Sequence, residues 1–154
     1  PFRAATHNMG ELRFVSITTP KSWERYGIHA LEAVYPILGP GFETARHSGR
    51  EGRDLVHYTH RKGVDVVVAA ISDMLGGFGL LTLAGTRDHV QAVFKDTFFA
   101  FKAQLEAFIE FVRTGKRPFP WTETDELMRM LIAGRLSRDK GGVAVPIQEE
   151  AICH

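Results

Sequence analysis

The strongest constraint on the fold is a change in the period of the hydrophobic pattern along the chain. Between residues 43 and 94, short segments alternate apolar and polar side chains and are separated by turns rich in Gly, Arg and Asp. Alternation with period two is typical of strands, and strands this close in sequence form antiparallel hairpins. We therefore expect an antiparallel meander of about five strands, ETARHSG, DLVHYTH, DVVVAAIS, GLLTLAGT and HVQAVF. The nearly all-apolar segment DVVVAAIS predicts a central strand that is covered on both faces.

The residues before this region predict one strand and one helix. Residues 10–18 (GELRFVSIT) alternate weakly and are followed by Pro20, which indicates a strand and its end. Ser22 is positioned to cap a helix that runs to Leu38, where the sequence GPG follows. Apolar residues recur along this segment at helical spacing, so one face of the helix should be buried.

The residues after the strands return to a helical period. Phe98 to Thr114 gather their apolar side chains on one face and end at Gly115, a typical residue after a helix C-terminus. Thr122 and Asp125 resemble a capping box for a helix to about Asp139, and VAVPI can return as a short strand. This order of elements predicts an α+β fold with an open, mostly antiparallel sheet and helices packed on one face.

Length and composition restrict the class of protein. The 154 residues, 44% of them hydrophobic, are enough for one core, so we expect a single domain over residues 1–154. A net charge of +1 gives no argument for binding to nucleic acid or to an anionic membrane. The lone cysteine, Cys153, rules out an internal disulfide framework, and no apolar run reaches membrane-spanning length. We expect a cytoplasmic protein.

Several motifs, taken together, resemble one known family. HNMGELRFVSITTP, YGIHALEAVYPILG, FKAQLEAFIEFVRTGKRPF, TETDELMRMLIAGRLS and SRDKGGVAVPI occur in this order between about Met9 and Ile147. The order and spacing resemble the C-terminal domain of the glucose-fructose oxidoreductase, inositol dehydrogenase and rhizopine catabolism (Gfo/Idh/MocA) family. The resemblance implies a sheet domain like the C-terminal domains of dihydrodipicolinate reductase and glyceraldehyde-3-phosphate dehydrogenase.

The resemblance also implies a function. Members of the family are two-domain oxidoreductases that use NAD or NADP, act mostly on sugars and polyols, and hold the cofactor in an N-terminal Rossmann domain. The glycine clusters of this chain, GPGFETA and LGGFGLL, do not show the full G-x-G-x-x-G and do not join a strand to a helix. We therefore expect no cofactor-binding residues and no Rossmann domain in this chain, and no turnover by the chain alone.

His29 is the candidate catalytic residue. It aligns with the family histidine that reaches the substrate hydroxyl, and an imidazole is suited to accept a hydroxyl proton near neutral pH. The family often has an aspartate four residues earlier, where this chain has Arg25, whose guanidinium suits a carboxylated substrate. Glu32 is a candidate partner of His29, and Lys21 and Trp23 are candidate substrate contacts. The competing interpretations are a flank histidine, a solvated lysine and a packed tryptophan.

Other histidines do not predict a metal site. His57 and His60 are three residues apart in one predicted strand and therefore face opposite sides, so with His47 they offer at most two ligands together.

Two further classes of function stay open. The apolar strands offer more surface than one helix layer covers, which predicts a homo-oligomer through the open sheet face. The resemblance to the family implies that this oligomer is a dimer. The chain would then be either half of an oxidoreductase or a freestanding dimeric module that binds a ligand or partner without redox activity. An unrelated lyase or isomerase, with His29 and Glu32 as an acid-base pair, requires His29 at the bottom of a closed pocket.

Overall fold

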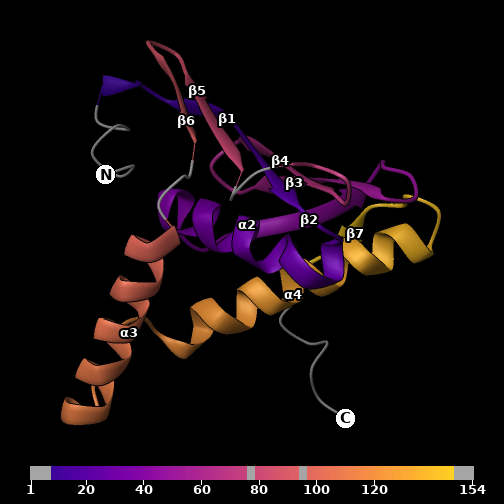
Figure 1. Cartoon of the computed structure of the whole chain (residues 1–154). Coiled ribbons are helices and arrows are strands. Elements are labelled where there is room, and N and C mark those ends of the chain that lie inside the picture. The colour runs from indigo at the N-terminus through magenta and orange to yellow at the C-terminus, as the bar shows by residue number, and fades with distance from the viewer. Residues whose placement is uncertain (1–7, 76–78, 94–96, 148–154) are drawn as a thin grey trace.

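The computed structural model describes residues 8–75, 79–93 and 97–147. These residues contain a seven-stranded sheet with the strand order β6-β5-β1-β4-β3-β2-β7. Two helices, α2 and α4, lie against one face of the sheet, and the opposite face is open (Figure 1). The elements are β1 (Leu12–Pro20), α2 (Trp23–Leu38), β2 (Phe42–His47), β3 (Arg53–His60), β4 (Val64–Ile71), β5 (Leu80–Gly85), β6 (His89–Val93), α3 (Thr97–Thr114), α4 (Trp121–Asp139) and β7 (Val145–Pro146).

The sheet is mostly antiparallel, which confirms the predicted α+β class, but it is not a simple meander. Strand β1 lies between β4 and β5 and pairs in parallel with β4, from Phe14 opposite Asp65 to Pro20 opposite Ile71. The five strands that follow α2 therefore form two groups, β2–β3–β4 and β5–β6, on either side of β1. Hydrophobic alternation identifies strands but does not say which strands are neighbours, and β4 takes its second neighbour from the start of the chain.

Strand β4 is the central strand, as predicted, but helices cover only one of its faces. Val64, Val66, Val68 and Ala70 point toward the helices and are buried. On the open face Asp65 is exposed, so the expectation of cover on both faces is not met by the described chain.

The core fills the space between the sheet and the two packed helices. Helix α2 turns Leu31 and Val34 toward the strands because these residues share one side of the helix with Gly27 and Ala30. The fully buried Tyr58 of β3 crosses the core, and its hydroxyl donates to the Met130 carbonyl at 3.0 Å. Burial raises the pKa of this phenol, so it stays a donor.

Helix α3 departs from the expected packing. It begins and ends almost where the sequence predicts, and Gly115 follows it with φ of 68°. However, α3 projects from the helix layer away from the sheet (Figure 1). Apolar side chains of this helix, among them Phe101, Leu105 and Phe108, stay exposed. The prediction that all helices pack on the sheet is wrong for α3. An apolar stripe indicates that a helix has a packing partner, but it does not identify that partner.

The start of α4 also differs from the prediction. Pro120 is the N-cap residue and no side chain caps the helix, so the capping box expected from Thr122 and Asp125 does not form. Asp125 instead pairs with Arg129 one turn later.

Glu126 anchors the first turns of α4 to the end of α2. Its Oε2 accepts from the Tyr35 hydroxyl at 2.7 Å, and its Oε1 accepts the backbone N–H groups of Gly41 and Phe42 at 2.8 and 3.0 Å. Burial, and then the neighbouring Glu126 carboxylate, raise the pKa of Tyr35. One carboxylate thus joins α2, α4 and the start of β2.

His60 gives the fold a testable pH dependence. Its Nδ1 accepts the Lys62 N–H at 3.2 Å, its Nε2 lies 3.4 Å from the Gly39 carbonyl, and its ring meets the Phe42 ring edge-on at 4.9 Å. This arrangement suits the neutral ring with its proton on Nε2, and burial lowers the pKa of His60 from 6.5. As the pH falls below about 6.5, the unfolded chain therefore binds more protons at this residue than the folded chain does. The free energy of unfolding should fall with the pH.

We expect the urea midpoint of the wild type to decrease from about pH 7.5 to about pH 5.5, in the range where histidine titrates. His60→Gln should start from a lower midpoint but lose less of it over the same range. The other six histidines are present in both proteins, so the difference between the two profiles isolates His60. Parallel profiles would contradict the assignment.

Candidate functional site

The predicted site residues Arg25, His29 and Glu32 lie on one exposed ridge of α2. Their spacing of four and three residues places them on one side of the helix, opposite the buried Ala30 and Leu31. The side chain of His29 is 45% exposed, and the Tyr26 ring meets its ring edge-on with centroids 5.4 Å apart. The ridge therefore faces away from the sheet, and His29 lies on a surface rather than at the bottom of a closed pocket.

Glu32 fixes the chemistry that His29 can offer. The Nδ1 atom of His29 lies 3.2 Å from Oε2 of Glu32, one helical turn away. A carboxylate only accepts hydrogen bonds, so a neutral His29 paired with it carries its proton on Nδ1. The Nε2 atom is then the basic nitrogen. This arrangement orients the imidazole as a carboxylate orients other functional histidines.

The other two predicted substrate contacts, Lys21 and Trp23, lie in different surroundings. Lys21 is exposed in the turn between β1 and α2 and has φ of 67°, a left-handed conformation that costs energy in a lysine. Trp23 is 1% exposed, and its indole N–H donates to the Leu131 carbonyl at 3.0 Å. The Trp23 ring thus lies in the core between α2 and α4, whereas Lys21 lies on the surface, four residues before Arg25 in the chain.

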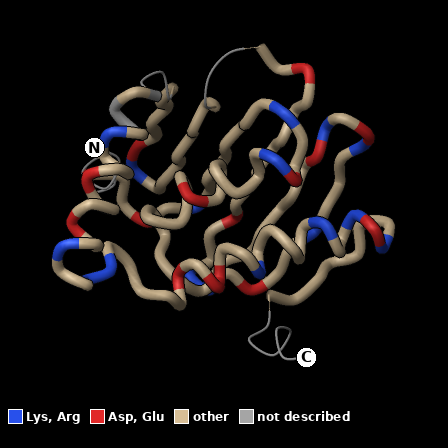
Figure 2. The backbone as a smooth tube through the Cα atoms, turned by 60° about the horizontal axis from the view of Figure 1, so that its bottom comes forward, with Lys and Arg blue, Asp and Glu red and all other residues tan. Residues whose placement is uncertain are grey.

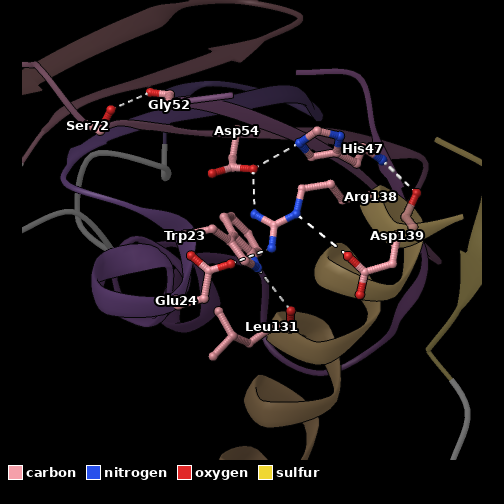
Figure 3. A network of polar contacts seen from close by, with 10 residues as sticks. Trp23, Glu24, His47, Gly52, Asp54, Ser72, Leu131, Arg138 and Asp139 are labelled. Carbon is pink, nitrogen blue, oxygen red and sulfur yellow. Dashed lines mark hydrogen bonds and ion pairs between the residues drawn. The ribbon is translucent and has the colours of Figure 1, made fainter. Parts of the chain in front are cut away.

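The structure also shows a polar cleft that the sequence did not indicate. The cleft has a volume of about 730 Å³ and lies where α2 begins, where the β2–β3 hairpin turns and where α4 ends. Figure 3 shows a polar network to which several of its lining residues belong. The lining residues are Ser22, Glu24, His47, Ser48, Gly49, Arg50, Glu51, Gly52, Asp54, Arg138, Gly141 and Gly142.

A network of charged side chains, of which Asp54 is buried, joins the elements that line this cleft. Oδ1 of the buried Asp54 lies 3.0 Å from Nε2 of His47 and accepts from the Arg138 guanidinium at 3.0 Å. Arg138 also pairs with Glu24 of α2, and this hydrogen bond is the main reason why the pKa of Glu24 is lowered. The network is satisfied internally, so its first role is to hold the start of α2, which carries the ridge, against β2, β3 and α4.

The three histidines that were weighed as metal ligands occupy separate places. His47 and His60 are buried on the helix side of the sheet, whereas His57 is on the open face with its Nε2 2.7 Å from Oδ1 of Asp65. His57 and His60 therefore face opposite sides, as their spacing predicts. Within residues 8–75, 79–93 and 97–147, no group of three or more His, Cys, Asp or Glu side chains is arranged to hold a metal ion.

Lys and Arg positions are interspersed with Asp and Glu positions along the backbone (Figure 2). None of the helices in the described part of the chain combines the length and hydropathy that crossing a membrane requires.

Comparisons with known proteins match the chain through its structure. No family model matches the sequence, and no curated protein matches it. Among solved structures, a myo-inositol dehydrogenase from Corynebacterium glutamicum aligns with a TM-score of 0.78 and 15% identity, over 96% of this chain and 60% of that one. GenD2 from gentamicin A biosynthesis, in complex with NAD, aligns with 0.79 and 15%, over 96% and 58%. A myo-inositol dehydrogenase from Lactobacillus casei, in complex with NAD(H) and myo-inositol, aligns with 0.75 and 13%, over 99% and 58%.

These matches confirm the fold class. The chain has an α+β fold with an open, mostly antiparallel sheet, as found in part of each of these dehydrogenases. They agree with the resemblance to the C-terminal domain of the Gfo/Idh/MocA family that the sequence motifs predict. The chain spans about 60% of the length of the dehydrogenases it matches.

Proposed function

We propose that this chain is the substrate-binding and oligomerising part of an NAD(P)-dependent oxidoreductase that acts on a sugar, a polyol or a related hydroxy compound. The observation that carries the proposal is the exposed ridge of Arg25, His29 and Glu32 on a fold shared with inositol dehydrogenases. An exposed histidine held by a carboxylate suits a site that a second domain completes. It does not suit a lyase or isomerase that is complete in itself.

The dinucleotide is assigned to a domain outside this chain. The turn from β1 to α2 is Lys21-Ser22 and contains no glycine, and the GPG sequence at Gly39 follows a helix instead of opening one. Neither turn can cradle a pyrophosphate in the manner of a Rossmann fold. When bound by its own domain, a nicotinamide cofactor would supply the hydride acceptor for the substrate carbon.

The residues of this chain would bind the substrate and move its proton. Nε2 of His29 accepts the hydroxyl proton, and Glu32 stabilises the imidazolium that results. Arg25, one turn before His29, offers a guanidinium fork to a carboxylate on the substrate. Lys21, four residues before Arg25, adds a second positive charge. Trp23 is left out of this surface because its ring lies in the core.

A dimer through the open sheet face belongs to the same proposal. Phe14, Leu55 and Leu80 are large apolar residues of strands β1, β3 and β5 that stay exposed. They lie among polar side chains such as His57 and Asp65, a composition suited to an interface between subunits. The same face supports the second candidate function, a freestanding dimeric module without redox activity.

The test is an assay of the complete native polypeptide beside this chain alone. The mass of the polypeptide in its source cells should be roughly twice that of the chain, as two domains require. The purified protein should reduce NAD⁺ or NADP⁺ with at least one member of a panel of myo-inositol, aldoses and aldonates, and the chain alone should not. A native mass equal to that of this chain, with no cofactor reduction, would favour the freestanding module.

A further inference from the structure

The charges on the exposed ridge of α2 are not balanced within the described chain. Both acidic residues of α2 are already engaged: Glu24 pairs with Arg138 of α4 (Figure 3), and Oε2 of Glu32 lies 3.2 Å from Nδ1 of His29. Arg25 is exposed, and no carboxylate in the part of the chain that the structure describes lies within ion-pair distance of its guanidinium. The ridge therefore carries a positive charge that these residues do not neutralise.

The position of Arg25 on α2 keeps this charge away from α4. Trp23 and Gly27 mark the side of α2 that packs on α4. The Trp23 N–H donates to the Leu131 carbonyl, and a Cβ atom on Gly27 would lie 3.0 Å from the Leu131 side chain. Arg25 is two residues from each of them, which places it on nearly the opposite side of the helix. Its charge lies in solvent on the side that carries His29, outside the ion-pair network between α2 and α4.

This unpaired charge opposes the chemistry proposed for His29 when the substrate is neutral. Side chains four residues apart on a helix have Cβ atoms about 5 to 6 Å apart, and like charges at this spacing repel each other. Once Nε2 of His29 has taken a proton, the ridge carries the positive charges of His29 and Arg25 against the single carboxylate of Glu32. A neutral sugar or polyol leaves this excess in place, whereas a carboxylate on the substrate removes it.

We propose that the substrate is a sugar acid, an aldonate or a uronate, whose carboxylate binds Arg25 while the hydroxyl to be oxidised lies at Nε2 of His29. This inference rests on the proposed function and names its substrate class. A guanidinium donates two parallel hydrogen bonds to a carboxylate, which fixes the orientation of the ligand. The carboxylate keeps its bonds: the substrate carbon loses hydride to the dinucleotide, its hydroxyl loses the proton to Nε2, and the C–O bond becomes a carbonyl.

A phosphate ester is the competing anionic substrate. A phosphate group carries nearly two negative charges on three oxygens, and proteins usually bind it with several donors, such as an arginine cluster or the amides of a glycine-rich loop. The ridge offers the single guanidinium of Arg25, whose planar fork matches a carboxylate. Glu32 on the same ridge disfavours a second negative charge. The donors of the ridge therefore suit a carboxylate better than a phosphate.

The experiment compares matched pairs of compounds with the complete protein. The two members of each pair differ at one carbon: D-glucuronate and D-glucose, D-galacturonate and D-galactose, D-gluconate and D-glucitol. Calorimetry measures binding, and steady-state kinetics measures cofactor reduction. In at least one pair the acid should exceed its neutral partner in affinity and in kcat/KM about 10- to 100-fold, the range for a hydrogen bond to a charged group. D-Glucose 6-phosphate tests the competing phosphate.

Arg25→Gln and Arg135→Gln are the matched variants. Each removes one exposed positive charge from a helix, and the Arg135 side chain on α4 is 60% exposed. Arg25→Gln should lower kcat/KM for the acid by the same 10- to 100-fold and leave that of the neutral partner at least as high as in the wild type. Arg135→Gln should keep the preference for the acid.

Three results would overturn the substrate class. The first is equal affinity and equal kcat/KM for both members of every pair. The second is a preference for D-glucose 6-phosphate over D-glucuronate, which would assign Arg25 to a phosphate. The third is an equal effect of the two variants, which would indicate a general effect of net charge.

The two measurements separate this inference from the proposed function. Cofactor reduction without a preference for acids refutes only the substrate class. Binding of an acid that depends on Arg25, without cofactor reduction, refutes only the oxidoreductase activity.

Discussion

Replacing His29 with glutamine in the complete protein is expected to lower kcat/KM for the cofactor-linked reaction about 10²- to 10⁴-fold, the usual contribution of a general base. Glutamine keeps a hydrogen-bonding side chain of similar reach but cannot accept the substrate proton. His29 is exposed on α2 and its contacts include Glu32 and Tyr26, so the substitution should leave the fold intact. Steady-state kinetics should show the loss mainly in kcat, with an unchanged circular dichroism spectrum.

Glu32→Gln is the matched control for this result. It keeps an oxygen within reach of Nδ1 of His29 but removes the charge that stabilises an imidazolium. We expect it to reduce kcat less than His29→Gln does, because the base itself remains. If His29→Gln retained nearly full activity, His29 would be a surface histidine and the proposed site would be wrong. If both variants were equally inactive, Glu32 would itself touch the substrate.

Replacing Trp23 with alanine is expected to cost about 3 to 5 kcal/mol of unfolding free energy, the usual cost of truncating a buried large aromatic residue. The indole is 1% exposed and lies against two glycines that leave room for it. A Cβ atom on Gly134 would lie 2.7 Å from the ring, and one on Gly27 would lie 3.0 Å from it. Urea unfolding of the wild type and the variant measures the difference directly.

Trp23→Phe separates packing from hydrogen bonding. Phenylalanine fills most of the space but removes the N–H that donates to the Leu131 carbonyl, so we expect a smaller loss of about 1 to 2 kcal/mol. A loss below about 1 kcal/mol for Trp23→Ala would be that of a surface substitution, and would show that the ring is not packed as described. In that case the alternative role of Trp23 as a substrate contact would regain support.

The local elements of the fold were predictable because each depends on its own residues. Period two identified the strands from Phe42 to Val93, and glycine identified the end of α3. The capping box of α4 failed because Pro120 begins the helix and Asp125 pairs with Arg129, a competition between local partners that a motif does not resolve. The position of β1 between β4 and β5 was missed because pairing joins residues about fifty positions apart.

The candidate site divides in the same way. Arg25, His29 and Glu32 could be found from the sequence because helical spacing alone places them on one ridge. The cleft at the start of α2 could not, because Glu24, His47, Asp54 and Arg138 come from four elements and no spacing relates them. Nor did the sequence separate Trp23 from Lys21 as candidate substrate contacts, since they lie two residues apart at the start of α2 and only packing decides which of them is buried.

By itself, the sequence determined the α+β class, the helical ridge that carries His29 and the opposite facing of His57 and His60, because periodicity is fixed by backbone geometry. The tertiary structure decided the strand order, the part-buried Asp54–Arg138 contact and the exposure of apolar side chains on α3. These depend on contacts between residues far apart in the chain. An apolar face indicates only that a helix packs against something. Whether it packs against the sheet or against another domain depends on where the rest of the fold places the helix.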